Sequence, residues 1–372
     1  MPYIVNWSKY PLPQKEWEYF ATLDLAKRRK FLKEHGLQYL RKNNVPRCEM
    51  CNHVFFHCVC DDPEFAKKKL LWQKELKKSF KGKLTHSQRL VQKVLDKARK
   101  YHLNIYLAYS GGIDSECCLQ LFKEGIKEGL ITVIVGNTTT ELPDTFRRWK
   151  EAETELGVKF IYALPERGVT FKSNAIKNGL SVYPRNAEIG EEKRNPTKLC
   201  CENLKENPQF KLMKKADGII LGLKATENSQ GRRWTIFKNG DCFFTANGKW
   251  NIKPIAYWTI ENEWEYQRLM KFKYNTIYDK SNCNKIGLFK LSTGKFFQIR
   301  SGCAFCPQGI YSGYLEWLRE YYPKWYDALK KTYNEVAEIR GDGMNFLQVL
   351  LIKKKTEMVK QKQLPCGEPL FK

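Results

Sequence analysis

The chain lacks histidine over most of its length. Its five histidines lie at residues 35, 53, 57, 86 and 102, and residues 103–372 contain none. Chemistry in that larger part cannot use an imidazole base, so metal ions, carboxylates, lysine, arginine or thiols must carry it. A run of about 18 apolar residues is also missing, which excludes a membrane-spanning helix, and the first residues lack a secretory signal pattern. We therefore expect a cytoplasmic protein that does not contact a membrane.

Acidic residues are scarce relative to basic ones. The chain has 65 Lys+Arg against 40 Asp+Glu, a net charge of +25, and residues 1–100 alone carry a surplus of 13 positive charges. A basic region of that size favours a polyanionic partner such as DNA or tRNA. The alternative is a lysine-rich composition that only keeps the protein soluble.

Cysteine, in contrast, is abundant, with 13 residues. Without an export signal, these cysteines argue against a disulfide framework and for metal or redox chemistry. The length of 372 residues allows two or three modules. We expect a basic helical module at 1–102, which includes a cysteine-rich segment at 46–62, a catalytic domain at 103–309 and a helical region at 310–372.

Strand and helix patterns alternate within the expected catalytic domain. Four β-rich runs, at 104–109, 131–135, 158–162 and 218–222, are separated by helical segments. This order predicts a Rossmann-like α/β fold with a parallel sheet and helices on both faces. Ligands in such sheets bind at the carboxyl ends of the strands. Two Asn-Gly pairs within residues 234–256 predict a β-hairpin insertion.

The first of these strands runs directly into the string Ser110-Gly-Gly-Ile-Asp-Ser115. Glycines at 111 and 112 let the backbone approach a phosphate, and the N-terminus of the following helix favours an anion. Asp114 would repel phosphate unless it holds Mg²⁺. The string resembles the pyrophosphate-binding loop of enzymes that split ATP between its α and β phosphates, and it is not a Walker loop. The residues predicted to bind the nucleotide here are Tyr109, Ser110, Gly111, Gly112, Ile113, Asp114 and Ser115.

Two cysteine pairs lie further along the chain. Cys200-Cys201 are adjacent, and Cys303-x-x-Cys306 is followed by proline, a pattern that recurs at iron–sulfur sites. Adjacent cysteines seldom coordinate one zinc, whereas four thiolates suit a [4Fe–4S] cluster. The hypothesis is therefore a cluster held by these four residues, with a zinc site or two unrelated buried pairs as alternatives.

A third group of thiols lies in the N-terminal module. Cys48-x-x-Cys51 and Cys58-x-Cys60 fall within 13 residues, a spacing that can close a tetrahedral Zn²⁺ site. His53 or His57 could replace one thiol. A second iron–sulfur cluster or free thiols are the alternatives.

Several motifs together resemble the phosphoadenosine phosphosulfate reductase and ATP sulfurylase branch of the pyrophosphate-loop superfamily, over roughly residues 103–310. They are Ser110–Ser115, Gly136-Asn-Thr-Thr-Thr-Glu-Leu-Pro-Asp144, Lys198-Leu-Cys-Cys201, Leu221-Gly-Leu-Lys-Ala-Thr-Glu-Asn228 with Arg232-Arg233, Lys253-Pro-Ile, and Arg300-Ser-Gly-Cys-x-x-Cys-Pro307. The chain departs from the family pattern in having Lys224 where the family usually has arginine and Thr139 where it usually has glycine.

The resemblance implies roles for individual residues of these motifs. Lys224, Arg232 and Arg233 would act catalytically with Asp114 by neutralising phosphate or pyrophosphate charge. Further nucleotide contacts would come from Asn137, Thr138, Glu141 and Gly222.

The intact loop and the four cysteines resemble those of DNA phosphorothioation sulfurtransferases. The first hypothesis is therefore an enzyme that adenylates DNA or tRNA with ATP and Mg²⁺ and inserts sulfur from a partner such as a cysteine desulfurase. The second is a reductase of a sulfated adenine nucleotide with Cys366 as nucleophile, although the tail Leu364-Pro-Cys-Gly-Glu368 lacks the histidine that such reductases usually have. The third is a nucleotide-sensing or DNA-binding subunit without catalysis.

Overall fold

The computed structural model describes residues 12–23, 27, 30–31, 34, 63–180, 195–227, 230–306, 313–342 and 344–350. The chain divides into two compact units, Met1–Ser79 and Phe80–Lys372. In the first unit the described helices are α1 (Gln14–Thr22) and α3 (Pro63–Lys77). The cysteine-rich segment, with the predicted zinc ligands Cys48, Cys51, Cys58 and Cys60, lies outside the described residues, and so does Cys366.

A six-stranded sheet forms the centre of the second unit. Its strand order is β3-β2-β1-β4-β6-β5, and every neighbouring pair is parallel except β5–β6. The strands are β1 (Ile105–Tyr109), β2 (Ile131–Gly136), β3 (Ile161–Ala163), β4 (Gly218–Ile220), β5 (Cys242–Phe244) and β6 (Trp250–Ile252). This arrangement confirms the predicted α/β fold class.

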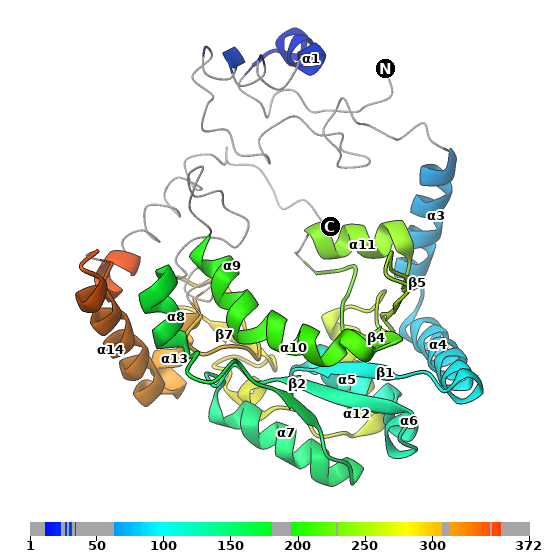
Figure 1. Cartoon of the computed structure of the whole chain (residues 1–372). Coiled ribbons are helices and arrows are strands. Elements are labelled where there is room, and N and C mark those ends of the chain that lie inside the picture. Colours follow the sequence, from blue (N-terminus) through cyan, green and yellow to red (C-terminus); the bar gives the residue numbers. More distant parts are fainter. Residues whose placement is uncertain are drawn as a thin grey trace. The chain divides into compact units, whose positions relative to one another are not determined.

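The two faces of the sheet carry separate apolar layers. Leu107 and Val133 join the large core on one face, whereas Ile134 and Ala163 join a smaller cluster on the other. Figure 1 shows α10 over one face of the sheet and α5, α7 and α12 beneath the other. Successive side chains along a strand point to opposite faces of the sheet. Because consecutive residues of these strands are apolar, both faces need helices to cover them.

The other elements of this unit connect or cover the strands. The helices are α4 (Phe80–Tyr101), α5 (Ile113–Leu121), α6 (Lys123–Lys127), α7 (Pro143–Leu156), α8 (Phe171–Asn178), α9 (Pro196–Cys201), α10 (Asn207–Leu212), α11 (Gln230–Asn239), α12 (Ile260–Met270), α13 (Tyr314–Tyr321) and α14 (Pro323–Arg340). Short turns are η4 (Glu202–Glu206), η5 (Met213–Lys215) and η6 (Thr276–Asp279), and β7 (Leu288–Lys290) pairs with β8 (Phe296–Gln298) in a separate ribbon.

Two predictions of local structure need correction. The third strand is β3 rather than 158–162, because the N–H groups of Val158 and Phe160 donate to Glu153 and close the end of α7 instead of pairing with β2. The predicted hairpin at 234–256 is a hairpin only from β5 onward, since α11 continues to Asn239. Its second strand, β6, also pairs with β4 and so extends the main sheet.

The compact unit begins earlier than the predicted catalytic domain. On α4, Leu90, Val94 and Leu95 are buried in the same apolar core as the sheet. The hydroxyl of Ser87 donates to Pro254 O at 2.6 Å, and Trp258 Nε1 donates to Ser87 Oγ at 3.0 Å. The second half of the predicted basic module is therefore an integral helix of the catalytic unit.

Helices α13 and α14 also belong to this unit. Trp317 and Leu329 are fully buried in the large core, and the Tyr322 hydroxyl donates to Asp144 Oδ2 at 2.5 Å. The C-terminal helices therefore brace the first turn of α7 rather than form a separate region. Among the described helices, none has the length and apolar character needed to cross a membrane.

Candidate functional site

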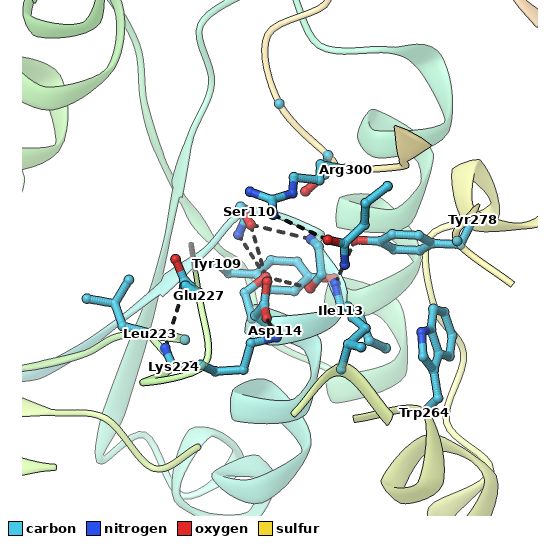
Figure 2. Close-up of a pocket in the computed structure, with 18 of the residues that line it drawn as sticks. Tyr109, Ser110, Ile113, Asp114, Leu223, Lys224, Glu227, Trp264, Tyr278 and Arg300 are labelled. Atoms are coloured by element: carbon cyan, nitrogen blue, oxygen red, sulfur yellow. Dashed lines mark hydrogen bonds and ion pairs between the residues drawn. The ribbon is translucent and has the colours of Figure 1, made fainter. Parts of the chain in front are cut away.

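A cavity of about 1180 Å³ opens at the carboxyl ends of β1, β2 and β4. This is the sheet edge at which the sequence places the ligand. Figure 2 shows the loop after β1 on one side and Lys224, Tyr278 and Arg300 around it. The predicted site residues in its wall are Tyr109, Ser110, Gly112, Ile113, Asp114, Ser115, Glu141, Gly222, Lys224 and Cys303.

The remaining predicted residues lie elsewhere. Gly111, Asn137 and Thr138 support the two loops of the site without forming part of the cavity wall. Arg232 and Arg233 belong to α11, and their side chains are outside the description.

The loop Ser110–Ser115 is a tight turn held by its own hydroxyls. Ser110 N–H donates to Ser115 Oγ at 3.2 Å, and the Ser115 hydroxyl donates to Gly112 O at 2.9 Å. Gly111 has a φ of +73°, and a Cβ there would lie 2.9 Å from Trp149 Nε1, so the turn requires glycine. Gly112 is the N-cap of α5, and its extended backbone leaves the first N–H groups of the helix at the cavity.

Three interacting ionisable residues lie at the cavity: Lys224 and Asp114 belong to its wall, and Glu263 is buried next to them. The ammonium of Lys224 is ion-paired with Asp114 and donates to Glu263 Oε2 at 2.6 Å. The side chain of Glu263 is 0% exposed, and Lys224 is 6% exposed. Glu263 comes from α12, whose start is fixed by a capping box between Thr259 and Asn262.

The three residues shift one another's pKa values. Burial and the neighbouring Asp114 charge raise the pKa of Glu263 well above its usual value. Burial alone would raise the pKa of Asp114 as well, but the hydrogen bond with Glu263 and the Lys224 ammonium outweigh it and lower that pKa. These shifts favour the neutral form of Glu263 and the carboxylate form of Asp114, with the Lys224 ammonium between them. Lys224 is ion-paired with Asp114, the residue that the sequence predicts to hold Mg²⁺, and magnesium binding stays a prediction.

A second buried network supports the loop from below. The Tyr109 hydroxyl donates to Glu116 Oε2 at 2.6 Å, and Arg148 donates to both oxygens of Glu116 at 2.9 and 3.1 Å. Arg148 and Glu116 are each 1% exposed. Because a charge pair this deep tolerates little displacement, it fixes the end of β1 against α5 and α7.

The segment after β2 contributes Glu141 to the cavity wall and holds it in place by local hydrogen bonds. Thr139 has a φ of +67°, in the left-handed region that favours glycine, and its N–H donates to Asn137 Oδ1 at 2.8 Å. This conformation explains why the related family usually has glycine at this position. The Thr138 hydroxyl donates to Glu141 Oε1 at 2.7 Å, and Glu141 forms an isolated antiparallel bridge with Cys303.

The four cysteines of the predicted [4Fe–4S] site do not form a metal-binding group. The described residues, which include all four, contain no set of three or more His, Cys, Asp or Glu side chains arranged to hold a metal ion. Cys200 packs against the large apolar core, whereas the Thr138 hydroxyl lies 3.4 Å from Cys303 Sγ. The donor set as arranged does not fit a cluster, and the prediction finds no support here.

Glu263, Tyr278 and Ser301 belong to the site but were not predicted from the sequence. Glu263 and Tyr278 reach the loop from positions 149 and 165 residues away from Asp114 and Ile113, and no local pattern marks them. Ser301 belongs to the motif that contains Arg300, and its Oγ lies 2.6 Å from the place of a Cβ on Gly112. That motif was the only signal that could have indicated Ser301.

Residues 104–308 match the family of the phosphoadenosine phosphosulfate reductase domain. The chain belongs to this family. The match confirms the family resemblance of the sequence motifs, and it covers every strand of the central sheet.

Individual relatives are more distant. The adenosine 5'-phosphosulfate reductase of Shouchella clausii is 31% identical over 124 residues, 33% of this chain and 49% of that protein. Adenosine 5'-phosphosulfate reductase 2 of Bacillus subtilis is 29% identical over 124 residues, 33% of this chain and 50% of that protein. The chain thus spans about half the length of these curated relatives.

Solved structures with similarity include two from yeasts. The phosphoadenylyl-sulfate reductase of Candida auris is 16% identical, with a TM-score of 0.39, over 59% of this chain and 93% of that one. The FMN adenylyltransferase of Candida glabrata in complex with ATP is 11% identical, with a TM-score of 0.36, over 58% of this chain and 67% of that one.

Proposed function

We propose that the cavity binds an adenine nucleotide and that the protein reduces a sulfated one, of the adenylyl sulfate class, to sulfite. The observation that carries the proposal is the loop Ser110–Ser115 facing Lys224 and Arg300 at the sheet edge. The family and both curated relatives support the choice of substrate, because they are named for reductases of sulfated adenine nucleotides.

In this proposal the protein's own residues hold the phosphate. The Ser110 hydroxyl and the N–H groups of Asp114 and Ser115 in the first turn of α5 donate to phosphate oxygens, and Arg300 and Lys224 neutralise the charge. Lys224 reaches the phosphate while it is ion-paired with Asp114 and with the buried Glu263, so its position is fixed before the ligand arrives.

The reduction needs a thiolate nucleophile. The thiolate attacks the sulfur of the sulfate group, the bond from that sulfur to the phosphate oxygen breaks, and AMP leaves with the electron pair. A second thiol, from a thiol reductant, then attacks the cysteine sulfur, releases sulfite and leaves a disulfide, so the two thiols supply two electrons.

Two cysteines can be compared as the nucleophile. Cys303 lies in the cavity wall, but burial and the neighbouring Glu141 raise its pKa, although Lys205 partly offsets them. Its thiol therefore stays protonated near neutral pH and attacks poorly. The nucleophile proposed here is Cys366, as the sequence predicts.

Adenylation of a nucleic acid followed by sulfur insertion is the second candidate function. The intact string Ser110–Ser115 favours it, because every residue type expected for splitting ATP is present. It requires ATP with Mg²⁺, DNA or tRNA, and a sulfur donor such as a cysteine desulfurase. Magnesium would have to share Asp114 with Lys224.

The proposal routes no step through a metal centre. The [4Fe–4S] cluster at Cys200, Cys201, Cys303 and Cys306 and the zinc site at Cys48, Cys51, Cys58 and Cys60 remain predictions. Iron, sulfide and zinc analysis of protein purified without oxygen tests both.

Product analysis separates the functions. With adenylyl sulfate and a dithiol reductant, we expect sulfite and AMP in equal amounts, and we expect Cys366→Ser to abolish both. Release of AMP and pyrophosphate from ATP that increases with DNA or tRNA, without sulfite from adenylyl sulfate, would support the second candidate instead. Tight nucleotide binding without any turnover would support a nucleotide-sensing subunit.

A further inference from the structure

Tyr278 is a buried tyrosine whose hydroxyl lies at the nucleotide loop. It belongs to η6, is 5% exposed, and forms part of the cavity wall. Its ring packs edge to face on Trp264, with centroids 5.4 Å apart. Figure 2 shows the hydroxyl of Tyr278 directed at the backbone of Ile113.

A tyrosine hydroxyl can both accept and donate a hydrogen bond, and the bond found here uses only its acceptor oxygen. Ile113 N–H, in the first turn of α5, donates to Tyr278 Oη at 3.0 Å. The oxygen is thus an acceptor, and the hydroxyl proton is left to donate elsewhere. Within the described part of the chain, no acceptor is recorded for that proton.

The surroundings keep this proton on the hydroxyl, whose oxygen lies near the N-cap of α5 at the cavity. Burial, followed by the nearby Asp114 charge, raises the pKa of Tyr278 well above its usual value, so the hydroxyl stays a donor at any working pH. The place of a Cβ on Gly112 lies 3.4 Å from Tyr278 Oη and 2.6 Å from Ser301 Oγ. Two hydroxyls therefore converge on the N-cap of the phosphate-binding helix.

We propose that Tyr278 binds the phosphate of the nucleotide. Its hydroxyl accepts the N–H of Ile113, which fixes the first turn of α5, and donates its own proton to a phosphate oxygen held at the loop. A buried donor that lacks an acceptor costs free energy, and an anionic acceptor removes that cost when the ligand binds. This inference rests on the proposed nucleotide site and adds a residue that the family motifs did not indicate.

The chain offers a matched control for the test. Tyr274 lies four residues earlier and also packs on Trp264, with centroids 5.1 Å apart, but its hydroxyl donates to Asp279 and is not in the cavity wall. Tyr278→Phe and Tyr274→Phe each remove one hydroxyl from the same aromatic cluster. A difference between them reports on the cavity rather than on packing.

The experiment is calorimetric titration of the full chain and both variants with AMP and with adenosine. We expect Tyr278→Phe to weaken AMP binding about 10- to 100-fold, as for one hydrogen bond to a charged group. Adenosine binding should stay unchanged, and Tyr274→Phe should match the parent protein for both ligands.

Several other results would overturn the inference. Equal weakening of AMP and adenosine by Tyr278→Phe would show that the hydroxyl only stabilises the helix. If the parent protein binds AMP and Tyr278→Phe leaves the AMP affinity unchanged, the inference is wrong but the proposed function stands. If the parent protein does not bind AMP, both are wrong.

If Tyr278→Phe fails to fold, 3-fluorotyrosine at position 278 gives a second readout. Its fluorine resonance should shift with AMP and not with adenosine, and no shift with bound AMP would overturn the inference.

Discussion

The ion pairs of Lys224 illustrate how single residues decide both stability and binding. Replacing Lys224 with Met removes the cation that pairs with the buried carboxyl of Glu263 and with the partly exposed carboxyl of Asp114. We expect Lys224→Met to lower the free energy of unfolding by about 3 kcal/mol and to weaken AMP binding, as measured by urea unfolding and calorimetry. Lys205→Met is the control, because Lys205 is exposed in the cavity wall. Equal stability of the two variants would contradict the account.

Lys253 is a buried amine whose Nζ has no hydrogen-bond partner among the described residues. Burial lowers its pKa from 10.5 to about 8, and its ammonium lies 4.1 Å from the ring centroid of Phe243. Replacement by Met, which has a similar length without the charge, should raise the free energy of unfolding at pH 7 by on the order of 1–3 kcal/mol.

The pH dependence of this effect has a definite sign. Between pH 8 and pH 10.5 the unfolded chain binds a proton at Lys253 that the folded chain does not. The stability of the parent protein should therefore rise with pH through this window, and that part of the rise should disappear in Lys253→Met. Urea unfolding of both proteins from pH 7 to pH 10.5 measures it, and parallel pH profiles would show that the amine is not desolvated.

Thr139 gives a prediction from backbone geometry. A β-branched residue at a φ of +67° is strained, whereas glycine adopts this conformation freely. We expect Thr139→Gly to raise the free energy of unfolding by about 0.5–1 kcal/mol. Thr132→Gly, within β2, should lower it. Destabilisation by both substitutions would contradict the strain at Thr139.

Among residues, the sequence predicts those whose neighbours lie close along the chain. Ser110 and Ser115 contact each other within one turn, and the motif is sufficient to place them. Glu263 and Tyr278 contact the same loop only because the sheet and α12 bring distant segments together. Their roles depend on tertiary packing, which a local pattern does not contain.

Among elements, strands with a clear apolar run between helical patterns were predictable, including the three-residue β4, and the strands of the β7–β8 ribbon were not. The apolar runs of β1 and β2 stand out against their helical neighbours, and both strands occur at the predicted residues. The three-residue strands of the β7–β8 ribbon have no such contrast. The predicted hairpin was only half right, because the Asn239-Gly240 pair ends α11 instead of forming a turn between strands.

The packing of α4 on the catalytic unit yields a prediction about elements. Gly125 of α6 lies so close to Leu95 of α4 that a Cβ would overlap the leucine side chain. We expect Gly125→Ala to lower the free energy of unfolding by about 1–3 kcal/mol. Lys127→Ala on the exposed side of the same helix should have little effect. Thermal unfolding of both variants compares them, and equal stability would mean that α4 does not pack on α6.

At the scale of the whole molecule, the boundary between the units lies at Ser79 and Phe80. A shortened chain that starts at Phe80 keeps the complete sheet, α4 and every residue of the cavity wall. We expect it to unfold cooperatively and to bind AMP as the full chain does. Loss of nucleic-acid binding in this shortened chain would assign that predicted partner to residues 1–79, and failure to fold would show that the two units depend on each other.

The central claim is that the loop at 110–115 holds the phosphate of an adenine nucleotide. Its most direct test is calorimetric titration of AMP into the parent protein, Gly112→Val and Gly302→Ala. A Cβ at Gly112 would lie 2.6 Å from Ser301 Oγ, so a larger side chain there would disturb the phosphate loop. A Cβ at Gly302, in the same cavity wall, meets nothing within 4 Å. The account predicts that AMP binds to the parent protein and to Gly302→Ala and that Gly112→Val abolishes binding. Unchanged AMP affinity in a folded Gly112→Val protein would contradict it.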